Sequence, residues 1–276
     1  MKNRFRCSMT TLIVALGFIF SLTSCEYETY VDAKYPAQKI YMPAAKQNIY
    51  NINSVPVAIG SVPTPGYPFR FVTDTIARDF KVLLGVYRSG INNDGPVIVN
   101  ISVNTDTIAV LKANGKIPAT AVPLTAENYT MASEVSIADG EELAKFELAV
   151  DMDLLRNNMD KKYVVAVKVT SPDRAVSTGL GTTIILIDAA IMKPTANFTS
   201  VPDANPKIIK FTNTTKFGMR YNWNFGDGSS MNTSNEVNTA VTHTYAAAGT
   251  YTVTLTAYGV TTSSDKSVKT ATITVQ

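Results

Sequence analysis

The chain has 276 residues, of which 45% are hydrophobic and 17% are charged, and its formal net charge is +3. That length fits about two domains, and the hydrophobic share is large enough for each to bury a core. Two cysteines and one histidine exclude a disulfide-stapled fold and a cysteine metal site, and they leave any histidine chemistry to a single residue.

The first 24 residues have the pattern of an export signal. Three basic residues precede an apolar run, Leu12–Phe20, that is too short to span a membrane. Leu22-Thr23-Ser24 then leads into Cys25, an order that resembles the bacterial lipobox. The resemblance implies cleavage before Cys25 and acylation of its thiol, which would make this residue the membrane anchor. A plain signal peptide with an incidental cysteine is the alternative.

Residues 25–35 are expected to form a polar, lipidated tether. Glu26, Glu28 and Asp32 follow soon after the cysteine, and this resembles the export signal of Bacteroidetes surface lipoproteins. The resemblance implies an outer-membrane lipoprotein displayed on the cell surface. Short acidic tethers are also common in solvated linkers, so periplasmic display stays open.

Cleavage also changes the charge balance. Lys2, Arg4 and Arg6 would leave with residues 1–24, so 22 of the 25 basic residues remain against 22 acidic ones. A mature chain without net charge gives no electrostatic case for binding nucleic acid.

Residues 36–190 read as many short strands with a period of two, which predicts a β-sandwich. The alternating runs at residues 80–86 and 97–103 are joined by a turn containing Asp94-Gly95, and we expect them to form a hairpin. One helix is expected over 106–113, capped by Asp106 and ended near Gly115. Residues 151–162 predict a polar connection with at most one helical turn.

Five ordered motifs in this part carry a family resemblance. They are G-V-Y-R-S-G at 85–90, N-I-S-V-N-T-D at 100–106, L-T-A-E-N-Y at 124–129, K-K-Y-V-V-A-V-K-V-T-S-P at 161–172 and T-T-I-I-L-I-D at 182–188. Together they resemble the DUF1735 family, an Ig-like domain of Bacteroidetes surface lipoproteins. The resemblance implies a domain that often precedes carbohydrate-active or carbohydrate-binding domains, and it supplies no catalytic residues.

Residues 194–276 follow a linker at Lys193-Pro194 and again predict strands. The motifs W-N-F-G-D-G at 223–228, H-T-Y at 243–245 and G-T-Y-T-V-T-L at 249–255 resemble those of a PKD domain, in the same order. The resemblance implies a second Ig-like sandwich, so the predicted fold class is all-β with two tandem sandwiches. Trp223 is expected in its core, and the Tyr251 hydroxyl is expected to bond backbone.

The sequence contains only weak candidates for catalytic or metal-binding residues. A Ser-His-Asp triad or a histidine metal site would have to use His243, for which we expect a structural hydrogen bond instead. Asp227 has the setting of a turn residue more than of a calcium ligand. Asp151 and Asp153 could pair as glycosidase carboxylates, but a solvated turn explains them. No nucleotide or zinc motif is present, so we expect a non-enzyme without cofactor or metal.

Tyrosines crowd the first quarter of the chain. Exposed aromatic rings can stack on sugars, and Tyr50, Tyr67 and Phe69 are the candidate glycan-binding residues, with core packing as the alternative. The predicted function is a non-catalytic surface lipoprotein that binds carbohydrate or assists glycan capture. The alternative is a structural spacer or adhesion module that docks to another surface protein.

Overall fold

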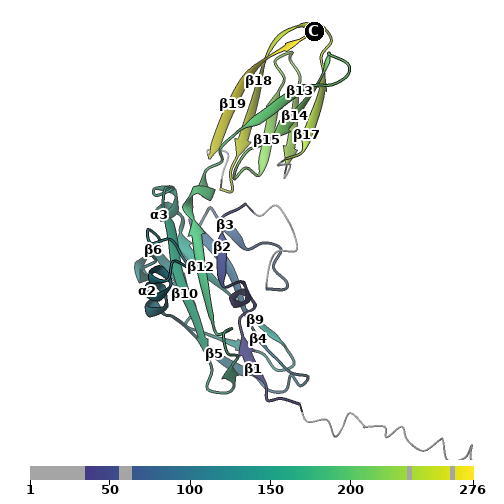
Figure 1. Cartoon of the computed structure of the whole chain (residues 1–276). Coiled ribbons are helices and arrows are strands. Elements are labelled where there is room, and N and C mark those ends of the chain that lie inside the picture. The colour runs from purple at the N-terminus through teal and green to yellow at the C-terminus, as the bar shows by residue number, and fades with distance from the viewer. Residues whose placement is uncertain (1–34, 56–63, 235–237, 262–264) are drawn as a thin grey trace, which may run out of the picture. The chain divides into compact units, whose positions relative to one another are not determined.

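The computed structural model describes residues 35–55, 64–234, 238–261 and 265–276 (Figure 1). Residues 1–34, including Cys25 and almost all of the tether, lie outside the described residues. The described chain is all-β, as predicted, and its strands form four sheets that belong to two sandwiches.

Two six-stranded sheets build the first sandwich. The first sheet has the order β11-β1-β4-β9-β7 with β3 beside β4. Its strands are β1 (Lys39–Tyr41), β3 (Phe71–Asp74), β4 (Asp79–Arg88), β7 (Tyr129–Met131), β9 (Leu143–Asp151) and β11 (Ala175–Val176). The second sheet has the order β2-β12-β10-β5-β8 with β6 beside β10. Its strands are β2 (Ile49–Ile52), β5 (Val97–Val103), β6 (Val122–Pro123), β8 (Glu134–Ile137), β10 (Lys162–Thr170) and β12 (Thr182–Asp188).

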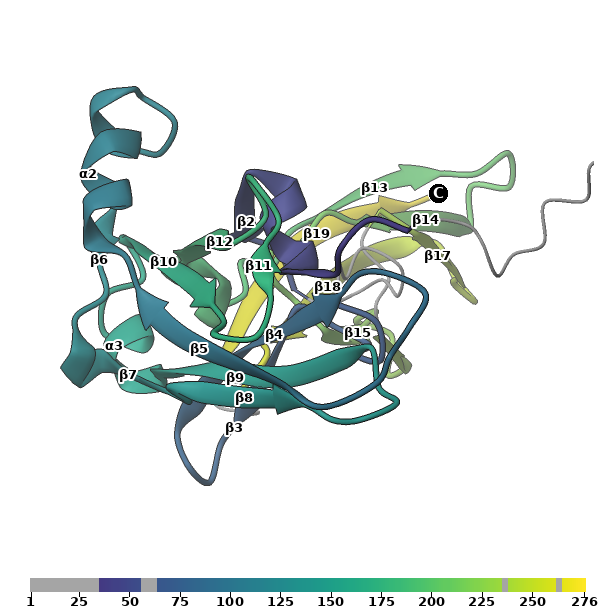
Figure 2. The same cartoon turned by 90° about the horizontal axis from the view of Figure 1, so that it is seen from below.

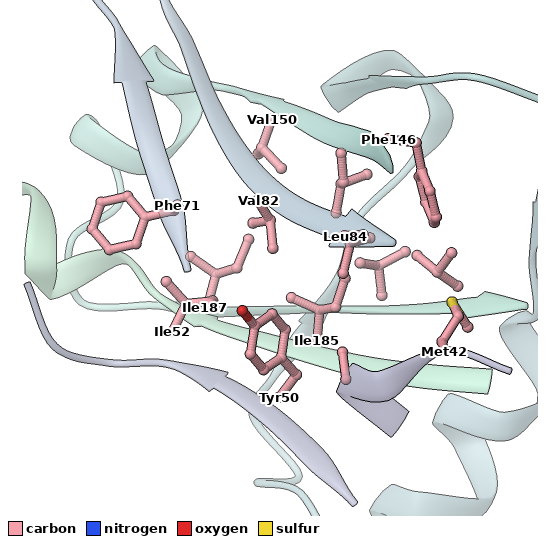
Figure 3. Close-up of a cluster of buried hydrophobic side chains, with 14 of the residues drawn as sticks. Met42, Tyr50, Ile52, Phe71, Val82, Leu84, Phe146, Val150, Ile185 and Ile187 are labelled. Carbon is pink, nitrogen blue, oxygen red and sulfur yellow. The ribbon is translucent and has the colours of Figure 1, made fainter. Parts of the chain in front are cut away.

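The core of this sandwich lies between the two sheets. Alternate residues of each strand point inward, as the period of two requires. Figure 3 shows the cluster, in which Val82 and Leu84 of β4 face Ile185 and Ile187 of β12. Tyr50 of β2 lies in the same cluster.

The predicted hairpin is wrong. The strands β4 and β5 belong to different sheets: β4 pairs with β9, whereas β5 pairs with β8 and β10. The connecting segment therefore carries the chain from one sheet to the other. Alternation fits both arrangements, because each strand has one core face whichever sheet it joins. Gly95 has a φ of 72°, so the expected turn glycine is present within this crossover.

Arg88, at the end of β4, points into the sandwich and is only 3% exposed. Its guanidinium donates to five backbone carbonyl oxygens, which belong to Asn93, Asp94, Gly95, Ala138 and Glu141. These carbonyls lie in two loops, 89–96 and 138–142. Within the described chain no carboxylate pairs with Arg88. The buried charge thus joins two loops through their backbones.

The predicted helix is present as α2 (Thr105–Ala113), but its cap differs from the expectation. The side chain of Asn104 accepts a hydrogen bond from the Thr107 amide at 3.3 Å, so Asn104 is the N-cap and Asp106 lies in the first turn. Ile108 packs α2 against Val164 and Ala166 on the outer face of β10 (Figure 2). This contact explains why residues of both faces of β10 are buried.

Short helical turns complete the first sandwich. The expected turn in the polar connection is α3 (Met152–Arg156), capped by Asp151. The 3₁₀ turns are η3 (Pro43–Gln47), η4 (Ala126–Asn128) and η5 (Ala189–Met192). The turn η3 comes just after β1 and begins with Pro43. Proline suits the first position of a helical turn, because the backbone amide at that position has no partner within the turn.

Two smaller sheets form the second sandwich. One has the order β13-β14-β17 and the other β16-β15-β18-β19. Their strands are β13 (Phe198–Pro202), β14 (Ile208–Asn213), β15 (Arg220–Asn224), β16 (Ser230–Ser234), β17 (Ala240–Thr244), β18 (Gly249–Tyr258) and β19 (Lys266–Val275). Trp223 is fully buried, which confirms its predicted place in the core. The Tyr251 hydroxyl donates to the Ala247 carbonyl at 2.9 Å, as expected.

Candidate functional site

A pocket of about 730 Å³ opens on the outer face of the first sheet. It falls within the usual size range of small-molecule sites. Its lining combines two tyrosine rings and other apolar groups with amides, hydroxyls and ammonium groups. The lining residues are Lys39, Tyr41, Pro43, Lys46, Gln47, Pro65, Tyr87, Ser89, Ser177 and Leu180.

The floor of the pocket comes from β1 and the end of β4. Ile40 points into the core, so its neighbours Lys39 and Tyr41 must point outward. Tyr41 lies opposite Tyr87 in the antiparallel register, and the two rings stack with centroids 5.7 Å apart. The Ser89 amide donates to the Lys39 carbonyl at 2.8 Å, which extends this pairing past the strand end.

One wall follows the parallel pairing of β1 with β11. The Ser177 amide donates to the Ile40 carbonyl at 2.8 Å, and the Met42 amide donates to the Leu180 carbonyl at 2.9 Å. These bonds hold the 177–180 turn beside β1. The turn η3 adds Lys46 and Gln47, both exposed, from the other end of β1.

The opposite wall contains Pro65. The absence of a side chain at Gly85 of β4 leaves room for Thr64, the residue before Pro65. A Cβ atom at Gly85 of β4 would lie 2.6 Å from the Thr64 methyl carbon and 2.9 Å from a Leu143 methyl carbon. Only glycine lets Thr64, which is fully buried, lie on the outer face of β4. Gly85 therefore positions Pro65 through Thr64.

The pocket holds polar groups that are free to meet a ligand. Within the described residues, the side chains of Lys39, Lys46, Gln47 and Ser177 make no hydrogen bond or ion pair. Burial, reinforced by Tyr41 and Glu142 nearby, raises the pKa of the Tyr87 phenol above its ordinary value. That phenol is therefore a neutral hydroxyl donor at physiological pH.

The three predicted glycan residues have different positions. Tyr50 is fully buried, so its ring offers no face for a sugar, and core packing holds instead (Figure 3). Tyr67 and Phe69 are partly buried and lie outside the pocket lining. Tyr67 contacts Lys145, whose ammonium is 5.0 Å from the ring centroid, on the same outer face as the pocket.

Sequence reasoning missed Tyr41 and Tyr87 as a pair. Tyr41 belongs to the tyrosine-rich stretch, and Tyr87 lies within the G-V-Y-R-S-G motif. A signal was present in the alternation of each strand, since the apolar residues Ile40 and Val86 place the neighbouring Tyr41 and Tyr87 on outward positions. The pairing of β1 with β4, in which Tyr41 and Tyr87 are separated by 45 intervening residues, could not be read from the sequence.

His243 makes the structural hydrogen bond that we expected. Its Nε2 lies 2.7 Å from Asp227 Oδ2, and its ring stacks on Phe225 with centroids 4.0 Å apart. Ser229 Oγ lies 3.3 Å from the same Nε2 and donates to Asp227 Oδ1 at 2.5 Å. A catalytic relay needs the acid and the nucleophile on different ring nitrogens. These three side chains share one nitrogen, so they brace a turn.

Asp227 makes this turn sensitive to acid. Burial acts to raise its pKa, but hydrogen bonds from Ser229 and His243 outweigh it and lower the pKa to about 2. The unfolded carboxyl titrates near 3.8, so the carboxylate stabilises the fold above about pH 4. This contribution is lost as the pH falls toward 2.

We expect Asp227→Asn to lower the free energy of unfolding by about 1–2 kcal/mol at pH 7, because the pair lies near the surface and water screens it. Urea unfolding followed by the fluorescence of Trp223, the single tryptophan, measures this at pH 7 and pH 2.5. The difference between variant and wild type should shrink at the lower pH. An unchanged difference at both pH values would contradict the assignment.

Asp151 and Asp153 have structural roles. Asp151 caps α3 by accepting from the Asp153 amide at 2.9 Å. Asp153 forms an ion pair with Arg78. Both carboxylates line a separate pocket of about 310 Å³. Within the described part of the chain, no group of three or more histidine, cysteine or acidic side chains could hold a metal ion.

The fold and pocket define a tandem of two all-β sandwiches with a cavity on the first. A family model for an N-terminal domain matches residues 35–176, more than half of the chain, so the chain belongs to that family. A model for the PKD domain matches residues 192–275, which identifies the second sandwich. No curated protein matches the chain.

Solved structures resemble parts of the chain. The PKD1 domain of Vibrio anguillarum Epp is 27% identical, with coverage of 30% of this chain and 94% of its own, and a TM-score of 0.25. A candidate carbohydrate binding protein from Bacteroides ovatus is 11% identical, with coverage of 86% and 70% and a TM-score of 0.38. A multidomain Bacteroides ovatus protein that includes DUF1735 is 13% identical, with coverage of 67% and 53% and a TM-score of 0.32. Scores of this size carry no inference about function.

Among the described residues, no helix is long and apolar enough to cross a membrane.

Proposed function

We propose that this protein is a non-catalytic carbohydrate-binding protein, held at the outer membrane by an acylated Cys25 and displayed on the cell surface. In this proposal its first sandwich is a DUF1735-type domain that captures glycan in the pocket above β1 and β4. The second sandwich, the PKD domain, carries no part of the glycan site.

One observation carries the binding role, the stacked pair of Tyr41 and Tyr87 inside a pocket with free polar groups. A sugar ring has an apolar face of C–H groups and a rim of hydroxyls. Aromatic rings pack against such a face, while amides and hydroxyls bond the rim. Gln47 and Ser177 supply this second kind of contact beside the rings.

The non-catalytic role has its own support. The acids Asp151 and Asp153 cap a helix and pair with an arginine, and His243 braces a turn. Each of these three side chains is thus engaged in a structural contact. Among the described residues no carboxylate lines the pocket above β1 and β4, and a glycosidase needs two across its substrate.

A glycan array tests the binding role with the mature, lipidated protein in detergent micelles, followed by calorimetry on the oligosaccharides that bind. We expect Tyr87→Ala to weaken binding about tenfold, because it removes one ring of the stack. Tyr87→Phe keeps the ring and should change affinity by less than about threefold.

Tyr258→Ala is the matched control. Tyr258 lines a different pocket, of about 470 Å³, on the second sandwich and lies under the Arg220 guanidinium. Its loss should leave glycan affinity unchanged. Two results would overturn the proposal: no binding to any glycan at millimolar concentration, or binding that depends on Tyr258 and not on Tyr87.

A further inference from the structure

We infer that the pocket above β1 and β4 selects anionic sugars, whose carboxylate or sulfate is bound by Lys39 and Lys46. This inference rests on the proposed function, and it names the class of glycan that the same site takes.

Among the described residues, the pocket is lined by two cationic side chains and no acidic one. Lys39 comes from β1 and Lys46 from the last turn of η3, so two separate elements bring a lysine to one cavity. None of the ten lining residues is acidic. The resulting field is positive, and it favours a ligand that carries negative charge.

Neither lysine forms an ion pair with another residue that the structure describes. The described chain forms ion pairs through Lys81, Lys162 and Lys210, but none through Lys39 or Lys46. Both side chains are exposed and make no hydrogen bond within the described residues. Their charges are therefore available to a ligand without the loss of an existing pair.

Glu142 is an acid whose charge acts on Tyr87 of this pocket. It lies close enough to Tyr87 to raise the pKa of that phenol, yet it is exposed and outside the lining. Asn93 donates to its Oε1 at 3.4 Å, on the side of the 89–96 loop. Glu142 thus lies at the rim, where it opposes the two lysines only weakly through water.

The stacked pair of Tyr41 and Tyr87 indicates where the charged group of a bound sugar would lie. Lys39 and Tyr41 share the outward face of β1, and Tyr41 stacks on Tyr87. A pyranose packed on the rings would present its rim substituents to the surrounding polar groups. A carboxylate or a sulfate ester on that rim has the charge that an ammonium group binds as a point charge.

Calorimetry with three oligosaccharide probes of matched length tests the inference. Hyaluronan fragments carry carboxylate alone, chondroitin sulfate fragments carry carboxylate and sulfate, and dextran fragments are neutral. We expect at least tenfold tighter binding of one or both charged probes than of dextran. Comparison of the two charged probes tells whether carboxylate suffices or sulfate is required.

The double variant Lys39→Gln/Lys46→Gln should lose about tenfold affinity for the charged probe and leave any neutral binding unchanged. Raising NaCl from 50 to 500 mM should weaken the wild type more than the double variant, because salt screens exposed charges. Lys145→Gln is the matched control: Lys145 lies on the same outer face, bonds the Gly66 carbonyl and does not line the pocket.

The outcomes separate this inference from the proposed function. Equal affinity for neutral and charged probes, with dependence on Tyr87, would overturn the anionic selectivity and leave glycan binding in place. Charged-probe binding that falls as much in Lys145→Gln as in the double variant would also overturn it. Absence of binding to every glycan would remove both.

Discussion

Replacement of Arg88 by methionine is expected to lower the free energy of unfolding of the first sandwich by about 3–5 kcal/mol. Methionine keeps a similar stem but loses all five donors. The carbonyls of Asp94, Gly95 and Glu141 would then lose the partner that Arg88 gives them. Backbone acceptors left unpaired in a buried site cost about 1–3 kcal/mol each, and partial access of water reduces the sum.

We expect Arg88→Met to change hydrogen exchange in the two loops as well as the free energy of unfolding. Besides the guanidinium, the Gly140 amide donates to the Asn93 carbonyl at 2.9 Å and the Gly95 amide donates to Asp139 Oδ1 at 2.6 Å. We expect these two amides to exchange hydrogen for deuterium faster in Arg88→Met, because the loops separate without the charge between them. Urea unfolding followed by circular dichroism gives the change in stability.

Two further arginine variants serve as comparisons for Arg88→Met. Arg88→Lys keeps the charge but has three donors in place of five, so a smaller loss of about 1–2 kcal/mol is expected. Arg78→Met removes an exposed arginine from a surface ion pair and should cost far less stability than Arg88→Met. Equal losses in Arg88→Met and Arg78→Met would contradict the role given to the buried guanidinium.

Arg88 shows what the sequence could not reveal. The motif G-V-Y-R-S-G was recognised, but nothing in it says that the arginine points inward. A charged residue two positions before a glycine normally predicts an exposed strand end. Its five acceptors are backbone carbonyls of two loops that the fold brings together. Three of them, at Asn93, Asp94 and Gly95, belong to a turn whose sequence does not indicate this contact. The cause of burial is tertiary, so no local pattern could predict it.

The same limit explains the incorrect hairpin. Local alternation in β4 and β5 correctly placed both strands and the turn glycine Gly95 between them. Partner choice depends on which sheet each strand joins, and a sandwich crossover has the same alternation as a hairpin. The helix α2 was predicted for a local reason and was found, although Asn104 and not Asp106 caps it.

The second sandwich was more predictable because its motifs are local and dense. Tyr221, Trp223 and Phe225 alternate in five residues, and all three are buried, Trp223 as expected. The glycan site was less predictable. Tyr50 and Tyr87 are both tyrosines in strands, yet one has no exposed surface and the other lines the pocket. Their strands belong to different sheets, because β2 pairs with β12 whereas β4 pairs with β1.

Cys25→Ala is expected to abolish incorporation of labelled palmitate and to move the protein from the membrane fraction to the soluble fraction. The proposed anchor would be the single acyl-bearing residue, because the sequence has two cysteines and Cys7 would leave with the proposed leader. One acyl chain binds a membrane only marginally, whereas two or three hold a protein stably. Loss of the thiol removes the attachment point for these chains, so the expected effect is complete.

Cys7→Ala supplies the matched control, because it removes the other thiol and leaves the proposed cleavage site intact. Label should enter this variant as it enters the wild type. Label that persists in Cys25→Ala would contradict the anchor, and so would a wild-type protein that takes up none. Proteinase treatment of intact cells then separates the two locations, since a surface-displayed chain is cut while a periplasmic one is protected. Glycan capture from outside the cell requires the first result, so this measurement also bears on the role proposed for the pocket.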